Sequence, residues 1–250
     1  MDTTAAATAS GDAINGLGTH FMLDMETYVY GAGLGFQGST FYVAGRGGCL
    51  GDVPAGVVAA AFIFFEPGYI AKAWEQTAGL LSRRQAAEEF AGAGHRWAEA
   101  HIPDDVDAAR LAELAGRIGD AASPSGAPLF AGWRSLPEPP SERPKAVALH
   151  RINALRELRG ALHGASVLAS GISPHDAVAR RTPYMLTVFG WPELTREEVR
   201  SIKDVVTEPW SGAQDATERV MGRAYESLSE SERGEFVELV NATQAAVTAG

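Results

Sequence analysis

The stretch Leu155-Arg-Glu-Leu-Arg-Gly-Ala-Leu-His163 combines an apolar helical pattern with two arginines and a histidine. Leu155, Leu158 and Leu162 recur at the spacing that places side chains on one face of an α-helix. A face of this kind is usually buried against the rest of a protein. The stretch therefore predicts a partly buried helix that carries cationic and titratable groups at the edge of its apolar stripe.

The cationic and titratable groups are Arg156, Arg159 and His163. At 100° per residue their side chains share the flank beside the leucine stripe. Charged groups at the edge of a core cost free energy unless an anionic or polar partner meets them. Two interpretations are open: the arginines could pair with carboxylates in a structural network, or the three groups could form the polar end of a small-molecule pocket.

Composition indicates an ordinary soluble globular protein of one large or two small domains. The chain has 250 residues, of which 46% are apolar, and no apolar run is long enough for a membrane span. The first residues lack the basic and apolar regions of a secretory signal, so we expect residues 1–18 to be a disordered lead. A single cysteine, Cys49, excludes an internal disulfide and fits a cytoplasmic location.

The charge balance argues against nucleic acid as a partner. The chain has 31 acidic and 21 basic residues, a net charge of −10. Residues 193–250 alone contain 12 acidic and 6 basic side chains. A protein that neutralises many phosphates normally presents a basic face. The C-terminal quarter therefore has a poor composition for contacting DNA.

Helix signals dominate the rest of the chain and predict an all-α fold. Capping boxes, in which an N-cap Ser or Thr precedes Glu or Gln by three residues, predict helix starts at Ser82, Thr195 and Ser229. Further helices are expected from Asp104 to about Asp120 and from Ser173-Pro174 toward Val188. No segment shows the sustained alternation of a β-hairpin.

Proline content divides the chain into two packed helical halves. Six of the thirteen prolines lie between residues 121 and 145. We therefore expect an N-terminal helical half over residues 19–122, a connector over residues 123–145 and a C-terminal helical half over residues 146–250. The connector contains apolar residues that should dock on the body of the protein: Leu129, Phe130, Trp133 and Leu136.

The most apolar segment, Val57–Pro67, predicts a helix buried on all sides that forms the centre of the N-terminal half. Pro67 should end it. Glu66 then lies at the C-terminus of a buried helix, where the helix dipole and burial both raise the pKa of a carboxyl group. Glu66 is therefore a candidate acid or base, with a solvated helix end as the alternative.

A glycine-rich segment, Phe41–Gly51, carries Arg46 and Cys49 but lacks the spacing of a phosphate-binding loop. Its glycines favour close approach of the backbone to another backbone or to a ligand. Cys49 is a weak candidate nucleophile, with packing as the alternative. The histidines show no metal-ligand spacing, so no metal site or cofactor is predicted. Haem ligation by His163 or another histidine is an alternative that no motif supports.

Several segments together resemble an actinobacterial helix–turn–helix-like family. The matching segments lie in order between about Met25 and Gly190: residues 44–51, 57–67 and 70–74, residues 126–131 with 136–137, and residues 155–163. The resemblance implies two helical halves, the second with a winged-helix-like region. That region is degenerate here, because Val205–Gly212 and a series of acids replace the expected wing pattern.

Departures from the family pattern suggest a change in a shared cavity. Leu158 and Ala161 stand where family members carry His and Asp, and Val29 and Cys49 replace a family His and Pro. Arg46, Arg156, Arg159 and His163 keep the family identity. If these positions surround one cavity, this chain has made it more apolar while retaining a cationic end.

These observations predict an enzyme of specialised metabolism that acts without a cofactor on a largely apolar, carbonyl-bearing substrate by cyclisation, isomerisation or elimination. Arg156 and Arg159 would polarise an oxygen and His163 would transfer a proton, with Glu66 as a further candidate. Arg46 and an aromatic wall would bind the substrate: Tyr28, Phe62, Phe65, Tyr69 and Trp74. The alternatives are a ligand-responsive transcription regulator and a non-catalytic ligand-binding or partner-binding protein, and the C-terminal helix could pair two chains in a homodimer.

Overall fold

The computed structural model describes residues 1–249, which form twelve α-helices and two short 3-10 helices without a β-strand. The all-α expectation is confirmed. The helices are α1 (Thr3–Leu23), α2 (Met25–Gly33), α3 (Thr40–Gly48), α4 (Ala55–Ala61), α5 (Pro67–Gln76), α6 (Arg83–His101), α7 (Ala108–Ala121), α8 (Pro128–Arg134), α9 (Pro144–Ala169), α10 (Pro174–Arg181), η1 (Pro183–Met185), α11 (Arg196–Gly222), η2 (Arg223–Ser227) and α12 (Glu230–Ala249).

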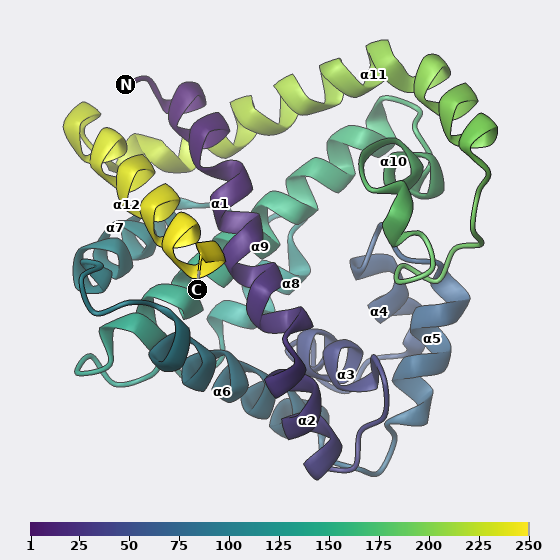
Figure 1. The fold of residues 1–250 in the computed structure, drawn as a ribbon, viewed down its shortest axis with the longest axis horizontal. Helices are drawn as coiled ribbons and strands as arrows, with labels where there is room; N and C mark the ends of the chain where they lie inside the picture. Colours follow the sequence, from purple (N-terminus) through teal and green to yellow (C-terminus); the bar gives the residue numbers. More distant parts are fainter. Residues whose placement is uncertain (250) are drawn as a thin grey trace.

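Helix α9, which contains the Leu155–His163 stretch, is the central element. It packs against α1, α6, α7, α8, α10 and α11 (Figure 1). Leu155 and Leu158 are buried, as the apolar stripe predicts, and Leu162 is partly buried. The main core continues from α1 through α9 to α12, so it crosses the expected boundary between the two halves. The division into halves stays a prediction.

The capping boxes begin helices where the sequence predicts. Ser82 and Gln85 exchange reciprocal hydrogen bonds at the start of α6, and Thr195 and Glu198 do so at the start of α11. The backbone N–H of Ser229 donates to Glu232, whose own N–H donates to the Ser229 hydroxyl at the start of α12. These side chains satisfy helix N–H groups that would otherwise lack partners.

Two other helices differ in length from their predictions. The helix expected from Asp104 begins at Ala108, because Asp107 is the N-cap and accepts from Arg110 N–H. The helix expected to reach Val188 ends at Arg181, because Pro183 disfavours helical backbone at the preceding residue. The chain then crosses to α11 through η1 and an extended segment.

The expected disordered lead is instead the start of a helix. Helix α1 begins at Thr3, with Asp2 as its N-cap. Its buried face includes Ala6, Ala7 and Ser10, and the helix lies beside α9, α11 and α12 (Figure 1). The small side chains of this face allow close packing against the neighbouring helices. The prediction for residues 1–18 was therefore wrong.

The prediction of one buried helix over Val57–Pro67 was also wrong. Helix α4 ends at Ala61, and Ile63 has a φ of 33°, a left-handed conformation that is rare for a β-branched residue. Val57 is 49% exposed, so the segment is not buried on all sides. The phenylalanines lie in the turn that follows α4, where Phe62 and Phe65 are buried. This turn places aromatic rings against the site described below.

The proline-rich connector is docked on the body of the protein. Helix α8 lies within it, and Leu129, Phe130, Trp133 and Leu136 are buried, as their apolar character predicts. The Trp133 indole N–H donates to the carbonyl oxygen of His150 in α9, 3.0 Å away. No helix among the described residues is long and apolar enough to cross a membrane.

Candidate functional site

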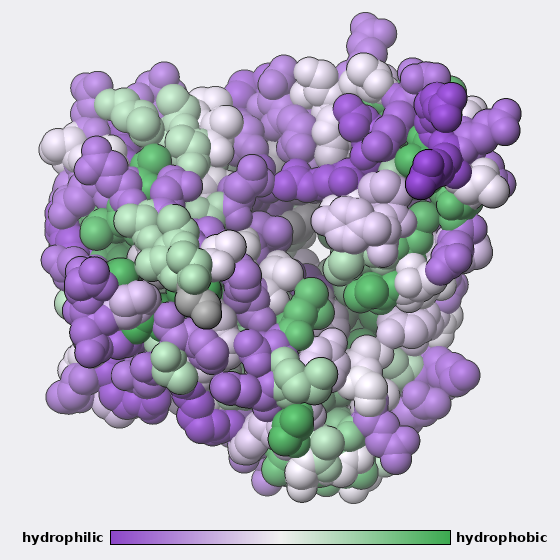
Figure 2. Space-filling view, viewed as in Figure 1, coloured by the Kyte–Doolittle hydropathy of each residue, from purple (hydrophilic) through white to green (hydrophobic). Residues whose placement is uncertain are grey.

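A cavity of about 210 Å³ lies beside α9, bordered by α1, α3, α10 and α11. In Figure 2 the surface is hollowed right of the centre of the view, between the positions of α9 and α10 in Figure 1. Four arginines line the cavity and no acidic side chain of the described residues does so. We call it the arginine chamber, defined by five of its lining residues: Arg46, Arg156, Arg159, Arg181 and His163.

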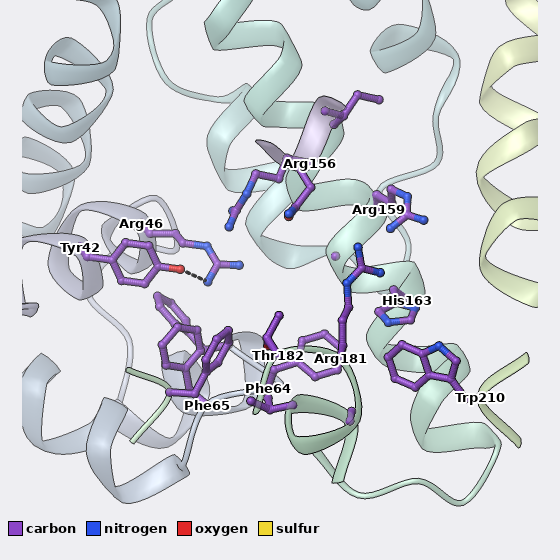
Figure 3. A pocket seen from close by; sticks show the side chains of 17 residues that line it. Tyr42, Arg46, Phe64, Phe65, Arg156, Arg159, His163, Arg181, Thr182 and Trp210 are labelled. Carbon is purple, nitrogen blue, oxygen red and sulfur yellow. Dashed lines mark hydrogen bonds between the residues drawn. The ribbon is translucent and has the colours of Figure 1, made fainter. Parts of the chain in front are cut away.

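A buried carboxylate holds two of the arginines in place. Glu157, which is 2% exposed, accepts hydrogen bonds from Arg46 Nε and Nη2, each 2.8 Å away, and from Arg156 Nη1 at 2.9 Å. Arg46 Nη1 also donates to the Tyr42 hydroxyl at 3.0 Å, drawn in Figure 3. Burial opposes the charge on Glu157, but Arg46 and Arg156 outweigh it and lower the pKa of its carboxyl group. Glu157 is therefore ionised at neutral pH.

The other two arginines are paired separately. Arg159 forms an ion pair with Glu218 of α11, and Arg181 pairs with Asp12 of α1 at 2.9 Å. The Asp12 side chain is 91% exposed, so this pair is solvated. Since Glu157 serves two guanidinium groups, four arginines meet three carboxylates and the chamber carries one positive charge in excess.

The arginine side chains reach the chamber by crossing α1 at two glycines. A Cβ on Gly18 would lie 2.3 Å from Arg156 Cδ, and a Cβ on Gly11 would lie 2.7 Å from Arg159 Nε. The two glycines are seven residues apart, so they lie on the same face of α1. Within residues 1–249, the Nε atoms of both arginines are buried and have no hydrogen-bond partner. Both Nε atoms therefore face α1 and not the open part of the chamber.

His163 is neutral and presents an acceptor. Burial, followed by the charges of Arg159 and Arg181, lowers its pKa to about 4. The Thr217 hydroxyl donates to the Ala213 carbonyl at 2.7 Å and lies 3.2 Å from His163 Nδ1. Because the hydroxyl proton is already used, His163 Nδ1 is the donor of that pair. Nε2 is then the unprotonated nitrogen.

Aromatic side chains form the rest of the wall. Phe62 and Phe65, both predicted from the sequence, line the chamber. The Arg46 guanidinium lies over the Phe62 ring, 4.4 Å from its centroid. On the opposite side, Phe64 and Trp210 flank His163, with ring centroids 5.6 and 5.3 Å from the imidazole (Figure 3). The chamber therefore combines four guanidinium groups with an aromatic wall.

Tyr28 and Tyr69, also predicted as wall residues, line a second chamber of about 340 Å³. We call this space the tyrosine chamber. Both chambers are lined by Asn15, Tyr42, Phe65, Arg156, Thr182 and Phe189, so they adjoin. The Tyr69 and Ser39 hydroxyls lie 2.6 Å apart. The tyrosine chamber is defined by six lining residues: Met22, Tyr28, Tyr42, Tyr69, Met185 and Val188.

Two predicted site residues lie elsewhere. Glu66 is the N-cap of α5, not the C-terminus of a buried helix, and its carboxylate accepts from the N–H groups of Gly68 and Tyr69. Trp74 is buried in the core, where its indole N–H donates to the Val53 carbonyl and Arg83 stacks 3.6 Å from its ring. Neither lines the arginine chamber, because the turn after α4 redirects the chain before both residues.

Cys49 is partly buried and in packing contact. Its thiol donates to the carbonyl oxygen of Arg46 at 3.1 Å. Burial, together with the charge of Glu157, raises its pKa to about 12, so the reactive thiolate is scarce. No group of three or more potential metal-binding side chains occurs within residues 1–249.

Sequence reasoning did not identify several residues of the chamber. Glu157 lies within the Leu155–His163 stretch. An acidic residue beside arginines and predicted buried leucines could have indicated a buried ion pair. Tyr42 is one turn before Arg46, a spacing that places both on the same face of α3. Arg181 and Trp210 carry no such signal, because α10 and α11 meet α9 only through tertiary packing.

The comparisons with known proteins identify a family but no characterised relative. The sequence profile of a helix-turn-helix family matches residues 7–250. No curated protein and no solved structure matches the chain. Membership of a helix-turn-helix family is compatible with nucleic-acid binding, which the acidic composition argues against. The chain belongs to this helix-turn-helix family.

Proposed function

We propose that the protein binds a small organic anion in the arginine chamber and that binding alters the position of α10 and α11. The observation that carries this proposal is the excess of guanidinium groups over carboxylates in a partly enclosed, aromatic-walled cavity. A positive charge in such a site is strongly stabilised by an anion that replaces its lost hydration. Arg156 and Arg159 both line the cavity, and a guanidinium group can donate hydrogen bonds to a carboxylate.

Binding is better supported than proton transfer. The sequence-based hypothesis gave His163 the role of general acid or base because the ordinary imidazole pKa lies near neutrality. Its pKa of about 4 makes it a weak base at neutral pH. A neutral imidazole with a free Nε2 instead suits a hydrogen bond from a hydroxyl or N–H group on the ligand.

The position of the chamber connects a ligand to the C-terminal helices. Helix α10 contributes Arg181 to the lining, and α11 contributes Trp210. Glu218 of α11 also pairs with Arg159, so an anion that engages Arg159 competes with this contact. Ligand binding would thereby change how α11 is held against α9. Together with the family match, this supports a ligand-responsive regulator.

A charge series tests the binding step. We expect isothermal titration calorimetry to show binding of naphthoate at neutral pH. Naphthylmethanol, which is neutral, and naphthylmethylammonium, which is cationic, should bind at least roughly tenfold more weakly, because neither satisfies the excess positive charge. Equal affinity for the three compounds would contradict the proposal.

The regulatory step needs a separate measurement. We expect the protein to retard DNA from its own upstream region in a gel-shift assay, with resistance to competitor DNA. Naphthoate should change the apparent affinity, whereas naphthylmethanol should not. Absence of retardation in low salt would reject DNA binding and leave ligand binding to be judged by calorimetry.

An enzyme is a second candidate, favoured by the free Nε2 of His163 beside the arginines. An anionic substrate would offset the charges of Arg159 and Arg181 and raise the pKa of His163 toward neutrality. Proton transfer during cyclisation, isomerisation or elimination would then become efficient. If a substrate is found, His163→Ala should reduce turnover at least roughly tenfold with the fold intact; unchanged turnover would remove this role.

A further inference from the structure

The two chambers together form an elongated site with a chemically distinct part at each end. Arg156, Tyr42 and Phe65 lie at the junction, because they line both spaces. Arg156 is the one charged side chain among the described residues that line the tyrosine chamber. Positive charge is thus confined to one end and the junction, and neutral groups line the other end.

The neutral end suits an aromatic body that carries oxygen. Burial and the neighbouring phenols of Tyr42 and Tyr69 raise the pKa of Tyr28, so it remains protonated and can donate. The Tyr42 hydroxyl accepts from Arg46 Nη1, which leaves its own proton available for donation. Methionine side chains, here Met22 and Met185, adapt to flat aromatic surfaces.

The tyrosine chamber also opens to solvent. Three residues of its lining are exposed: Leu23 by 40%, Val188 by 43% and Tyr184 by 80%. Leu23 ends α1, whereas Tyr184 and Val188 belong to the segment between α10 and α11. An apolar rim of this kind favours passage of a largely apolar molecule. A ligand could therefore enter through the tyrosine chamber with its charged group leading.

We infer that the natural ligand is an elongated aromatic monoanion with a carboxylate in the arginine chamber and a hydroxylated ring in the tyrosine chamber. This inference rests on the proposed function. The charge follows from the ion pairs: four arginines meet Glu157, Glu218 and Asp12, which leaves an excess of one. The length follows from the continuity of the two chambers.

Calorimetry with a short and a long probe tests the length. The short probe is naphthoate, and the long probe is naphthoate that carries a hydroxyphenyl group opposite the carboxylate. We expect the long probe to bind roughly tenfold or more tightly, because the added ring is removed from water. Naphthoate binding without a gain for the long probe would overturn the inference alone, whereas binding of neither probe would reject the proposed function.

A variant that fills the tyrosine chamber tests where the long probe gains its affinity. Thr19 lines the tyrosine chamber but not the arginine chamber. Thr19→Trp should abolish the advantage of the long probe and leave naphthoate affinity unchanged, which also reports an intact fold. Ala5→Trp, at an exposed position of the same helix, is the matched control and should bind both probes as wild type. A full advantage retained in Thr19→Trp would overturn the assignment.

A dianion tests the charge. Naphthyl phosphate carries close to two negative charges at pH 7.5, and naphthoate carries one. We expect naphthoate to bind more tightly, because the second charge of the phosphate ester has no excess arginine to meet it. Tighter binding of the phosphate ester would overturn the monoanion assignment.

Discussion

Two groups of arginines in this protein have similar partners but different surroundings. In the α7–α12 network, Arg110 and Arg117 meet Glu232, and Arg110 also meets Glu113 and Glu235. Carboxylates outnumber arginines there, and the side chains are partly open to water. In the arginine chamber, Arg46 and Arg156 share the single buried carboxylate of Glu157.

The difference shows what distinguishes a candidate binding site from a structural ion pair. The α7–α12 network has its charge met within the protein and needs no ligand. The arginine chamber combines excess positive charge, burial and unfilled volume. The α9 arginines form ion pairs with Glu157 and Glu218 and also line the cavity, so the structural network is observed and the small-molecule pocket stays a proposal.

The largest expected difference is in stability. Glu157→Gln leaves two largely buried guanidinium groups without a counter-charge and should lower the free energy of unfolding by about 3–5 kcal/mol. Glu232→Gln in the solvated α7–α12 network should have a much smaller effect. Urea denaturation at pH 7 measures both. Equal losses in the free energy of unfolding would mean that Glu157 stabilises the fold no more than Glu232 does.

The next largest effect on stability is expected at Gly18, where the Arg156 side chain passes α1. Gly18→Ala places a methyl group against Arg156 Cδ and should cost about 1–3 kcal/mol through overpacking. Gly234→Ala in α12 meets open space and should stabilise the protein by about 0.5–1 kcal/mol, because alanine favours helix. Thermal unfolding distinguishes the two signs. A stabilised Gly18→Ala variant would contradict the close approach of Arg156.

Ligand affinity should separate the two groups of arginines directly. Arg156→Met keeps much of the side-chain volume but removes the charge, and it should weaken naphthoate binding roughly tenfold or more. Arg117→Met removes a charge from the α7–α12 network and should leave the affinity unchanged. Calorimetry, with circular dichroism to verify the fold, provides the comparison. Equal losses in both variants would indicate a general charge effect instead of a site.

The smallest effect is the response to mild acid. His163 has its pKa lowered to about 4, chiefly by burial, so below pH 6.5 the unfolded chain binds a proton that the folded chain does not. Stability should therefore fall by about 1 kcal/mol for this group between pH 7 and 5.5. His163→Gln should lose less over that range. Arg117 and the Ser229 backbone lower the pKa of Glu232 to about 2, so this carboxylate of the α7–α12 network should not titrate there.

Local signals predicted much of the fold. The capping boxes at Ser82, Thr195 and Ser229 begin helices because a side chain within three residues satisfies the helix N–H groups. The spacing of Arg156, Arg159 and His163 placed them together because a regular helix of this length has little freedom. The error at Val57–Pro67 arose because uniform apolarity does not distinguish a buried helix from a turn whose rings enter a site.

The amino-acid sequence by itself determined that the chain is helical, where α6, α11 and α12 begin and which flank of α9 carries its cations. These properties depend on residues a few positions apart. Tertiary structure alone decided that Arg46, Arg181 and Trp210 meet that flank, that Glu157 neutralises two arginines at once and that Glu66 caps a helix outside the cavity. Charge excess and volume depend on the packing of α3, α9, α10 and α11, because each helix supplies only part of the wall.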